Sequence, residues 1–132
     1  MNLCFADTFF SLALLSEGDE AHERALTLNR SRSASLITTA WVLTEVGDAL
    51  ARPATRALFS ELLRVLQGDP DTTIVGPAQS LFKRGIGLYA DRPDKGWTLT
   101  DCISFVVMAE RGLREALTGD HHFEQAGFVT LF

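Results

Sequence analysis

The 132-residue chain is poor in cysteine and has no long apolar run, and each absence excludes a class of protein. Its two cysteines, Cys4 and Cys102, are far apart in apolar stretches, so they form neither a disulfide framework nor a zinc-binding pattern. We expect two buried thiols in a cytoplasmic protein. No uninterrupted apolar segment reaches about 18 residues, which excludes a membrane-spanning helix. The N-terminus lacks a basic region and reaches an acid at Asp7, so we expect no signal peptide.

The chain also lacks the excess of positive charge that is typical of nucleic-acid-binding proteins, because its net charge is −5. The charges are unevenly distributed, however. Residues 1–50 carry a net charge of −4, residues 51–100 a net charge of +2, and residues 101–132 a net charge of −3. The seven basic residues of the middle segment either form a surface for a polyanion or are ordinary solvated side chains. They are Arg52, Arg56, Arg64, Lys83, Arg84, Arg92 and Lys95.

Short apolar segments alternate with longer helical patterns, and the length suits one domain, residues 1–132. The segments expected to be strands are Leu3–Ala6, Ser35–Thr38, Thr72–Val75, Ala116–Leu117 and Phe128–Val129. The segments expected to be helices are Thr8–Ser16, Glu20–Asn29, Thr39–Leu50, Pro53–Gln67, Pro77–Tyr89 and Thr98–Arg111. This alternation predicts an α/β fold with a mainly parallel sheet, whose sites form beyond the carboxyl ends of the strands.

Three acidic residues fall where such a sheet gathers its loops. Asp7 directly follows the first strand, Asp101 lies in the first turn of an apolar helix, and Asp120 follows the fourth expected strand. Glu45 differs because it lies in the middle of a helix, where apolar Trp41 is one turn away. Glu45 therefore borders the buried face, and a carboxylate there needs a partner.

Each acid on its own also has a purely structural interpretation. Asp7 and Asp120 are candidate helix N-caps, and Asp101 is placed to complete a capping box with Thr98. Glu45 is a candidate partner for an arginine. Taken singly, these structural roles are the more common outcome for acids at helix starts.

Taken together, the four acids indicate a metal site. No histidine or cysteine cluster competes for that role. Carboxylates that converge without lysine or arginine repel one another and stay ionised only when cations neutralise them. Oxygen ligands suit Mg²⁺ or Mn²⁺ better than zinc. Such a site activates water and stabilises a departing oxyanion, which is the chemistry of phosphodiester cleavage.

The chain resembles the PIN-domain family, in particular the VapC-type toxin ribonucleases of bacterial toxin–antitoxin pairs. Four segments carry the resemblance, and their order and spacing span nearly the whole chain. They are Phe5–Thr8, Thr44–Val46, Leu99–Phe105 and Leu117–Phe128.

The resemblance places the family's four acids at Asp7, Glu45, Asp101 and Asp120, and therefore implies an intact metal site. It also implies a three-layer α/β/α fold, dependence on Mg²⁺ or Mn²⁺, and an RNA substrate. The family further implies a homodimer and a small cognate antitoxin. Asp48, one turn from Glu45, is either a fifth acid near the site or a solvated neighbour, and we favour the second interpretation.

Several neighbouring residues have two interpretations each. His121 and His122 follow Asp120, and we favour a surface position at a helix start over a catalytic base. The hydroxyls of Thr8, Thr100 and Thr118 either bond the carboxylates or cap helices. Trp97 either stacks on a base or, as we favour, packs against the helix that follows. The residues expected in the core at the first helix are Phe9, Phe10, Leu12 and Leu15.

A dense apolar stripe follows Pro53. It belongs either to the core or to a surface that binds a second copy of the chain or an antitoxin helix. The stripe comprises Leu58, Phe59, Leu62, Leu63, Val65 and Leu66.

Two other functions compete with a ribonuclease. An aspartyl-phosphate phosphatase with Asp7 as nucleophile is excluded, because Phe9 stands where a second aspartate is expected. The remaining alternative is a catalytically silent PIN-like module that binds RNA or a protein.

Overall fold

The computed structural model describes residues 3–31 and 35–132, which form a five-stranded sheet with the strand order β3-β2-β1-β4-β5. Every neighbouring pair of strands is parallel, so the expected parallel sheet is confirmed. The chain runs outward from β1 through β2 to β3 and then returns to add β4 and β5 on the other side of β1. The strands are β1 (Leu3–Ala6), β2 (Ser35–Thr39), β3 (Thr72–Val75), β4 (Glu115–Leu117) and β5 (Val129–Thr130).

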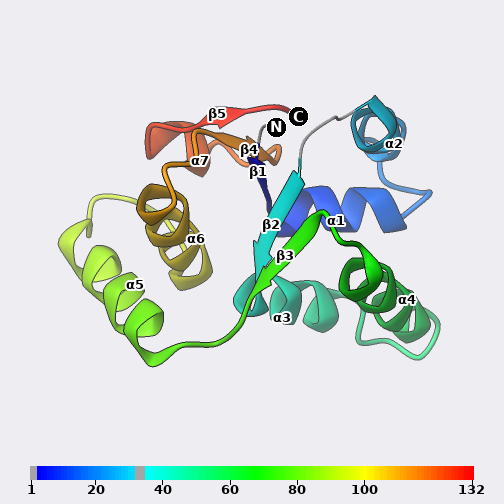
Figure 1. Ribbon diagram of the computed structural model, residues 1–132, viewed down its shortest axis with the longest axis horizontal. Helices are drawn as coiled ribbons and strands as arrows, with labels where there is room; N and C mark the ends of the chain where they lie inside the picture. Colours follow the sequence, from blue (N-terminus) through cyan, green and yellow to red (C-terminus); the bar gives the residue numbers. More distant parts are fainter. Residues whose placement is uncertain (1–2, 32–34) are drawn as a thin grey trace.

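Helices connect the strands and cover both faces of the sheet, and the expected three-layer α/β/α fold is confirmed. In Figure 1, α1 and α2 lie on one side of the strands, and α5, α6 and α7 lie on the other. The helices are α1 (Thr8–Leu15), α2 (His22–Ser31), α3 (Ala40–Ala49), α4 (Arg56–Gly68), α5 (Gln79–Asp91), α6 (Leu99–Glu110) and α7 (His122–Gln125).

Successive side chains of the central strand β1 pack into two separate hydrophobic cores. Phe5 points into the larger core, where it packs with Phe105 of α6 and Phe123 of α7. Cys4 and Ala6 point into a smaller core against α1 and α2. Side chains of a strand alternate between the two faces of its sheet, so a wholly apolar strand is required when both faces are buried.

Several element bounds differ from the sequence-based expectation by one to three residues. Helix α4 begins at Arg56 rather than at Pro53, and α5 begins at Gln79 rather than at Pro77. Strand β5 is displaced by one residue, to Val129–Thr130, and the short helix α7 was not expected. Proline fits the first turn of a helix but equally fits the turn before one, and Pro53 lies in such a turn.

The two cysteines agree with the expectation from the sequence. Cys4 and Cys102 are both buried, and no disulfide joins them. Burial raises the pKa of the Cys102 thiol, with a smaller contribution from the charge of Asp101. Within residues 3–31 and 35–132, no helix is both long enough and apolar enough to cross a membrane.

Candidate metal centre

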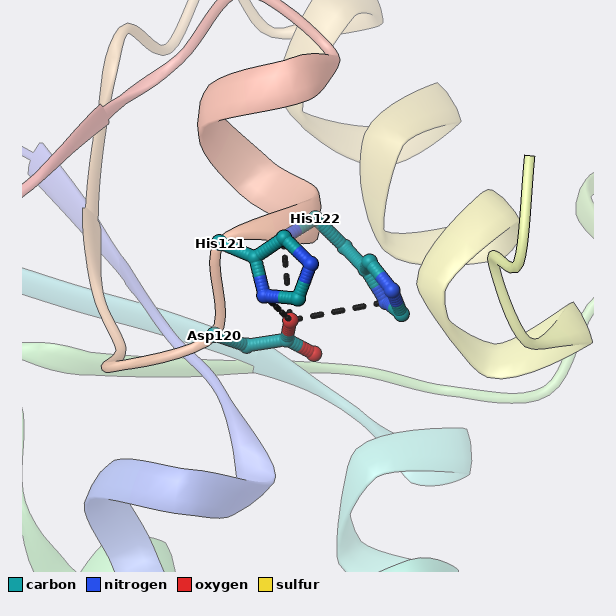
Figure 2. Close-up of side chains that lie close together, drawn as sticks. All are labelled: Asp120, His121 and His122. Atoms are coloured by element: carbon teal, nitrogen blue, oxygen red, sulfur yellow. Dashed lines mark hydrogen bonds and ion pairs between the residues drawn. The ribbon is translucent and has the colours of Figure 1, made fainter.

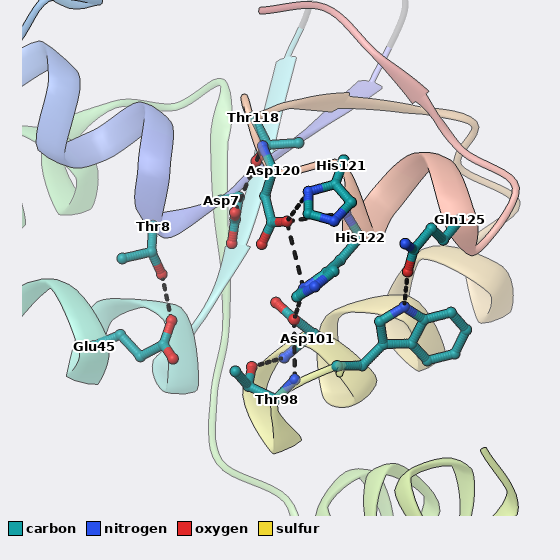
Figure 3. Close-up of polar contacts among 11 residues, drawn as sticks. Asp7, Thr8, Glu45, Thr98, Asp101, Thr118, Asp120, His121, His122 and Gln125 are labelled. Atoms are coloured by element: carbon teal, nitrogen blue, oxygen red, sulfur yellow. Dashed lines mark hydrogen bonds and ion pairs between the residues drawn. The ribbon is translucent and has the colours of Figure 1, made fainter. Parts of the chain in front are cut away.

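One cleft, of about 430 Å³, brings all four acids together: Asp7, Glu45, Asp101 and Asp120 line it. Asp7 and Asp120 come from the carboxyl ends of the neighbouring strands β1 and β4, Asp101 from the start of α6 and Glu45 from the middle of α3 (Figure 3). No lysine or arginine is among the residues that line this cleft.

Asp7 is the most deeply placed carboxylate, with 5% of its surface exposed. It occupies the N-cap position of α1, but its side chain makes no capping hydrogen bond. Instead, the buried hydroxyl of Thr118 donates a hydrogen bond to Asp7 Oδ2 over 2.9 Å.

The burial of Asp7 changes its proton affinity. Burial raises the pKa of Asp7 from 3.8 to about 6, and the charges of Asp101 and Asp120 add to the rise. Hydrogen bonds from the Thr8 backbone and the Thr118 side chain lower the pKa but offset only part of the rise. The charges of Asp101 and Asp120 therefore both act on Asp7, as expected of carboxylates that converge on a metal site.

Asp101 combines the two roles that the sequence left as alternatives. Its Oδ2 accepts a hydrogen bond from the Thr98 backbone at 3.0 Å, while the Thr98 hydroxyl accepts one from the Asp101 backbone. This capping box fixes the start of α6. The same side chain lines the cleft, so the capping role and the site role are compatible.

Asp120 is linked to Asp7 through Thr118. The Asp120 backbone donates a hydrogen bond to the Thr118 hydroxyl at 3.0 Å, and that hydroxyl in turn donates to Asp7. Asp120 Oδ1 accepts a hydrogen bond from the His122 backbone at 2.9 Å. The turn before α7 thus sets the positions of two carboxylates at once.

Glu45 stands on the other wall of the cleft. The Thr8 hydroxyl donates a hydrogen bond to Glu45 Oε1 over 2.7 Å, which ties α3 to the first turn of α1 (Figure 3). Unlike Asp101 and Asp120, Glu45 is not among the charges that raise the pKa of Asp7. Asp48, on the same helix as Glu45, is exposed and does not line the cleft, in agreement with a solvated neighbour.

His122, which we expected at the surface, contacts two of the acids, although it is not among the residues that line the cleft. Its Nδ1 lies 3.0 Å from Asp101 Oδ2 and 3.4 Å from Asp120 Oδ1, so the ring bridges two carboxylates. The His121 ring lies beside it but is 73% exposed, as expected of a surface histidine (Figure 2). Ligand atoms of Asp120, His121 and His122 all lie within 4.8 Å of one another.

The three threonines singled out in the sequence differ in whether they contact the acids. Thr8 and Thr118 bond the carboxylates, which is the first of the two alternatives that the sequence left open. At Asp101 the bonding threonine is Thr98 rather than Thr100.

Two aromatic side chains near the cleft have different outcomes. Phe9 was expected in the core, but it is 40% exposed and lines the mouth of the cleft, because the next residue, Phe10, faces the core. Trp97 packs as expected: it is 6% exposed, and its ring lies edge-on to Phe105 with centroids 5.0 Å apart.

A model of the PIN domain family matches residues 4–129. The chain belongs to the PIN domain family. The expected family is therefore confirmed, and the fold places the four acids at the carboxyl end of the parallel sheet of this PIN domain.

Solved structures with the same fold include the following three. VapC20 from Mycobacterium tuberculosis, described as a Sarcin-Ricin loop cleaving toxin, is 24% identical with a TM-score of 0.87, and 97% of each chain is covered. FitAcB from Neisseria gonorrhoeae is 14% identical with a TM-score of 0.68, covering 98% of this chain and 96% of that one. VapBC2 from Rickettsia felis, bound to a DNA fragment from its promoter, is 10% identical with a TM-score of 0.65, covering 97% and 96%. No curated protein matches the sequence.

The side chains of the site fit a divalent cation. In Glu45, Asp101 and Asp120, the hydrogen bonds with described residues fall on a single carboxylate oxygen. One oxygen of each is thereby fixed, and the second is left for a ligand. Together with the raised pKa of Asp7, this donor set matches the oxygen ligands that Mg²⁺ and Mn²⁺ prefer.

Proposed function

We propose that this PIN domain is a Mg²⁺- or Mn²⁺-dependent ribonuclease that hydrolyses phosphodiester bonds of RNA. The observation that carries the proposal is the cleft in which Asp7, Glu45, Asp101 and Asp120 converge without a lysine or arginine. A phosphodiester bound in this cleft lies among four carboxylates, whose negative charge alone would repel it. A divalent cation resolves the conflict.

Asp7, Glu45, Asp101 and Asp120 would hold the cation. When bound, the cation supplies the positive charge that offsets the carboxylates and the Lewis acidity needed for phosphodiester hydrolysis. Thr118 and Thr8 orient Asp7 and Glu45 through their hydroxyls. Hydrogen bonds of this kind hold the coordinating carboxylates in position before the cation binds.

His122 and the capping box hold the other two acids. The backbone of Thr98 and the ring of His122 both contact Asp101 Oδ2, so this carboxylate is held from two sides. Asp120 lies at the edge of the cleft with its Oδ1 against His122. We assign Asp120 the task of completing the site, by accepting a proton from the attacking water or by holding a second cation.

We further propose that the protein is the toxin of a toxin–antitoxin pair. VapC20, which shares this fold over 97% of both chains, is described as a toxin that cleaves the Sarcin-Ricin loop, and VapBC2 has a related fold. If this chain acts as VapC20 does, its substrate is RNA, and we expect a small antitoxin as its partner. The reading frame beside its gene tests the pairing: a short gene for a DNA-binding segment with a tail supports it.

The enzymatic proposal is tested with purified protein and a panel of structured and single-stranded RNAs. We expect cleavage with Mg²⁺ or Mn²⁺, none with EDTA, and loss of cleavage in Glu45→Gln. The matched control is Asp48→Asn, because Asp48 lies on the same helix but is exposed. Cleavage that persists in EDTA would contradict the metal mechanism, and no cleavage of any RNA would favour the catalytically silent module.

A further inference from the structure

A second cleft, of about 890 Å³, lies beside the carboxylate cleft, and none of the four acids lines it. It is formed by the end of α5, the start of α6 and the loop between them, and its lining includes Tyr89, Arg92, Lys95 and Trp97. Its volume is in the range of pockets that enclose small ligands.

The two clefts share a wall. Thr98, whose backbone bonds Asp101, lines both of them. The loop also passes close to the site at Gly96, where a Cβ atom would lie 4.0 Å from His122 Nε2. The two clefts are therefore neighbours, with Thr98 between them.

In the loop between α5 and α6, the basic residues line the second cleft and the acidic residues do not. Residues 91–95 contain two acids and two bases, and both bases, Arg92 and Lys95, line the cleft. Asp91 and Asp94 are not among its lining residues. A cleft of four acids thus adjoins a cleft with two cations, which suits a polyanion whose next phosphate lies beyond the metal site.

The two cations are held differently. The Arg92 guanidinium makes two hydrogen bonds of 3.0 Å to Asp94 and lies over the Trp97 ring, 5.2 Å from its centroid. Arg92 is therefore fixed and partly neutralised. The charge of Lys95 also acts on Asp94, but more weakly than that of Arg92, so Lys95 is the cation that is more available to a phosphate.

One aromatic ring of this cleft faces solvent. Tyr89, near the end of α5, is 55% exposed, whereas Trp97 is buried and its Nε1 donates a hydrogen bond to Gln125. Exposed aromatic rings stack on nucleobases, and stacking tolerates any base. Tyr89 and Lys95 together offer a base-stacking face and a phosphate-binding cation in one cleft.

We propose that this second cleft binds the nucleotide that flanks the scissile phosphate of a single-stranded RNA segment, with Tyr89 stacking on the base and Lys95 contacting its phosphate. The proposal rests on the proposed function and adds a subsite that determines where the strand is cut.

Binding is measured with Mg²⁺ in the Glu45→Gln background, so that the cation offsets the acids and cleavage does not interfere, as the fluorescence anisotropy of a labelled single-stranded RNA. We expect Tyr89→Ala and Lys95→Ala to weaken binding about tenfold each, and Tyr89→Phe to bind as the wild type does. Lys95→Ala should also make the plot of log affinity against log salt concentration shallower by about 0.7. Phe82→Ala and Lys83→Ala are matched controls, because both side chains are exposed on α5 outside the cleft.

Cleavage with Mn²⁺ then locates the subsite. We expect Tyr89→Ala to alter the choice of cut site within a mixed RNA, and Phe82→Ala to leave it unchanged. Unaltered binding and cut sites in Tyr89→Ala and Lys95→Ala would overturn the subsite while leaving the ribonuclease intact. The opposite result, RNA binding that depends on both residues without any cleavage, would support the cleft and reject the ribonuclease. If Lys95→Ala abolishes binding of polyglutamate but not of RNA, the cleft takes an acidic protein segment, and the proposal is wrong.

Discussion

The hydroxyl of Thr118 donates a hydrogen bond to Asp7 Oδ2 across 111 positions of the chain, and both residues are buried. The same hydroxyl accepts a hydrogen bond from the Asp120 backbone. A single threonine after β4 therefore positions the acid that follows β1 and the acid that precedes α7. This arrangement predicts how the site responds when that hydroxyl is removed.

We expect Thr118→Val to destabilise the metal-free protein by about 1–3 kcal/mol at pH 8, because valine keeps the shape and leaves the Asp7 carboxylate without its donor. The pKa of Asp7 should rise further, since the Thr118 hydrogen bond lowers it. Urea unfolding with EDTA measures the stability. Thr118→Ser, which keeps the hydroxyl, should restore most of it, and equal losses in the two variants would contradict the role of the hydrogen bond.

Asp7 makes the metal-free protein less stable as the pH rises. Its pKa is about 6 in the fold and 3.8 as a reference, so the folded state binds the proton more tightly than the unfolded chain. The free energy of unfolding therefore falls by on the order of 2–3 kcal/mol as the pH rises from about 4 to above 6. We expect Asp7→Asn to raise the melting temperature in EDTA at pH 8, with a difference that vanishes near pH 4.

Thermal melts across this pH range test the prediction, and Asp48→Asn is the control because that carboxylate is exposed. A melting temperature for Asp7→Asn that is below the wild type at pH 8 would show that the Asp7 charge is already compensated within the fold.

Asp101→Asn should give a smaller rise than Asp7→Asn, because Asp101 has a second task. Removing its charge relieves repulsion, but it also removes a favourable interaction with the start of α6, worth about 0.3–1 kcal/mol. The asparagine carbonyl still accepts the bond from Thr98. The variant should be stabilised less by Mn²⁺ than the wild type, since the ion binds only the folded form. An unchanged Mn²⁺ response would remove Asp101 from the metal site.

Much of the fold could be predicted because the strands carry strong signals. The apolar run Leu3–Ala6 and the β-branched run Thr72–Val75 are strands with the expected bounds. The helix starts near Pro53 and Pro77 were wrong, because a proline is compatible with a helix start and with the turn before it. The hydrogen bond from the Arg56 backbone to Arg52 forms a separate turn there, which no local pattern distinguishes from the helix.

The convergence of the acids could be predicted in part. Asp7, Asp101 and Asp120 follow parallel strands or begin a helix at the same edge, so topology alone brings them together. The role of His122 could not be predicted, because it depends on how the four-residue helix α7 turns its side chains. Its position two residues after Asp120 was the available signal, and that spacing is equally typical of a simple helix start.

The apolar stripe on α4 predicts self-association. Leu62 is buried in the core, but Leu58 is 37% and Val65 is 52% exposed. We expect light scattering to give twice the mass of 14.5 kDa, and Leu58→Lys combined with Val65→Lys to shift the protein toward the monomer. Phe82→Lys, at a similarly exposed ring on α5, is the control. A monomer at every concentration would contradict the dimer, and dissociation by Phe82→Lys would place the interface on α5.

The contact between α5 and α6, which frames the second cleft, depends on a glycine. A Cβ atom at Gly85 would overlap the buried Ile103 side chain and lie 3.4 Å from the Ile103 Cα. Gly85→Ala should therefore force the helices apart and destabilise the protein by roughly 1–3 kcal/mol. Gly87, two residues later on the same helix, has no atom within 4 Å of its Cβ position, so Gly87→Ala should stabilise by up to about 1 kcal/mol. Opposite shifts of the urea midpoint are expected, and a stabilising Gly85→Ala would show that α5 and α6 pack less closely than the structure indicates.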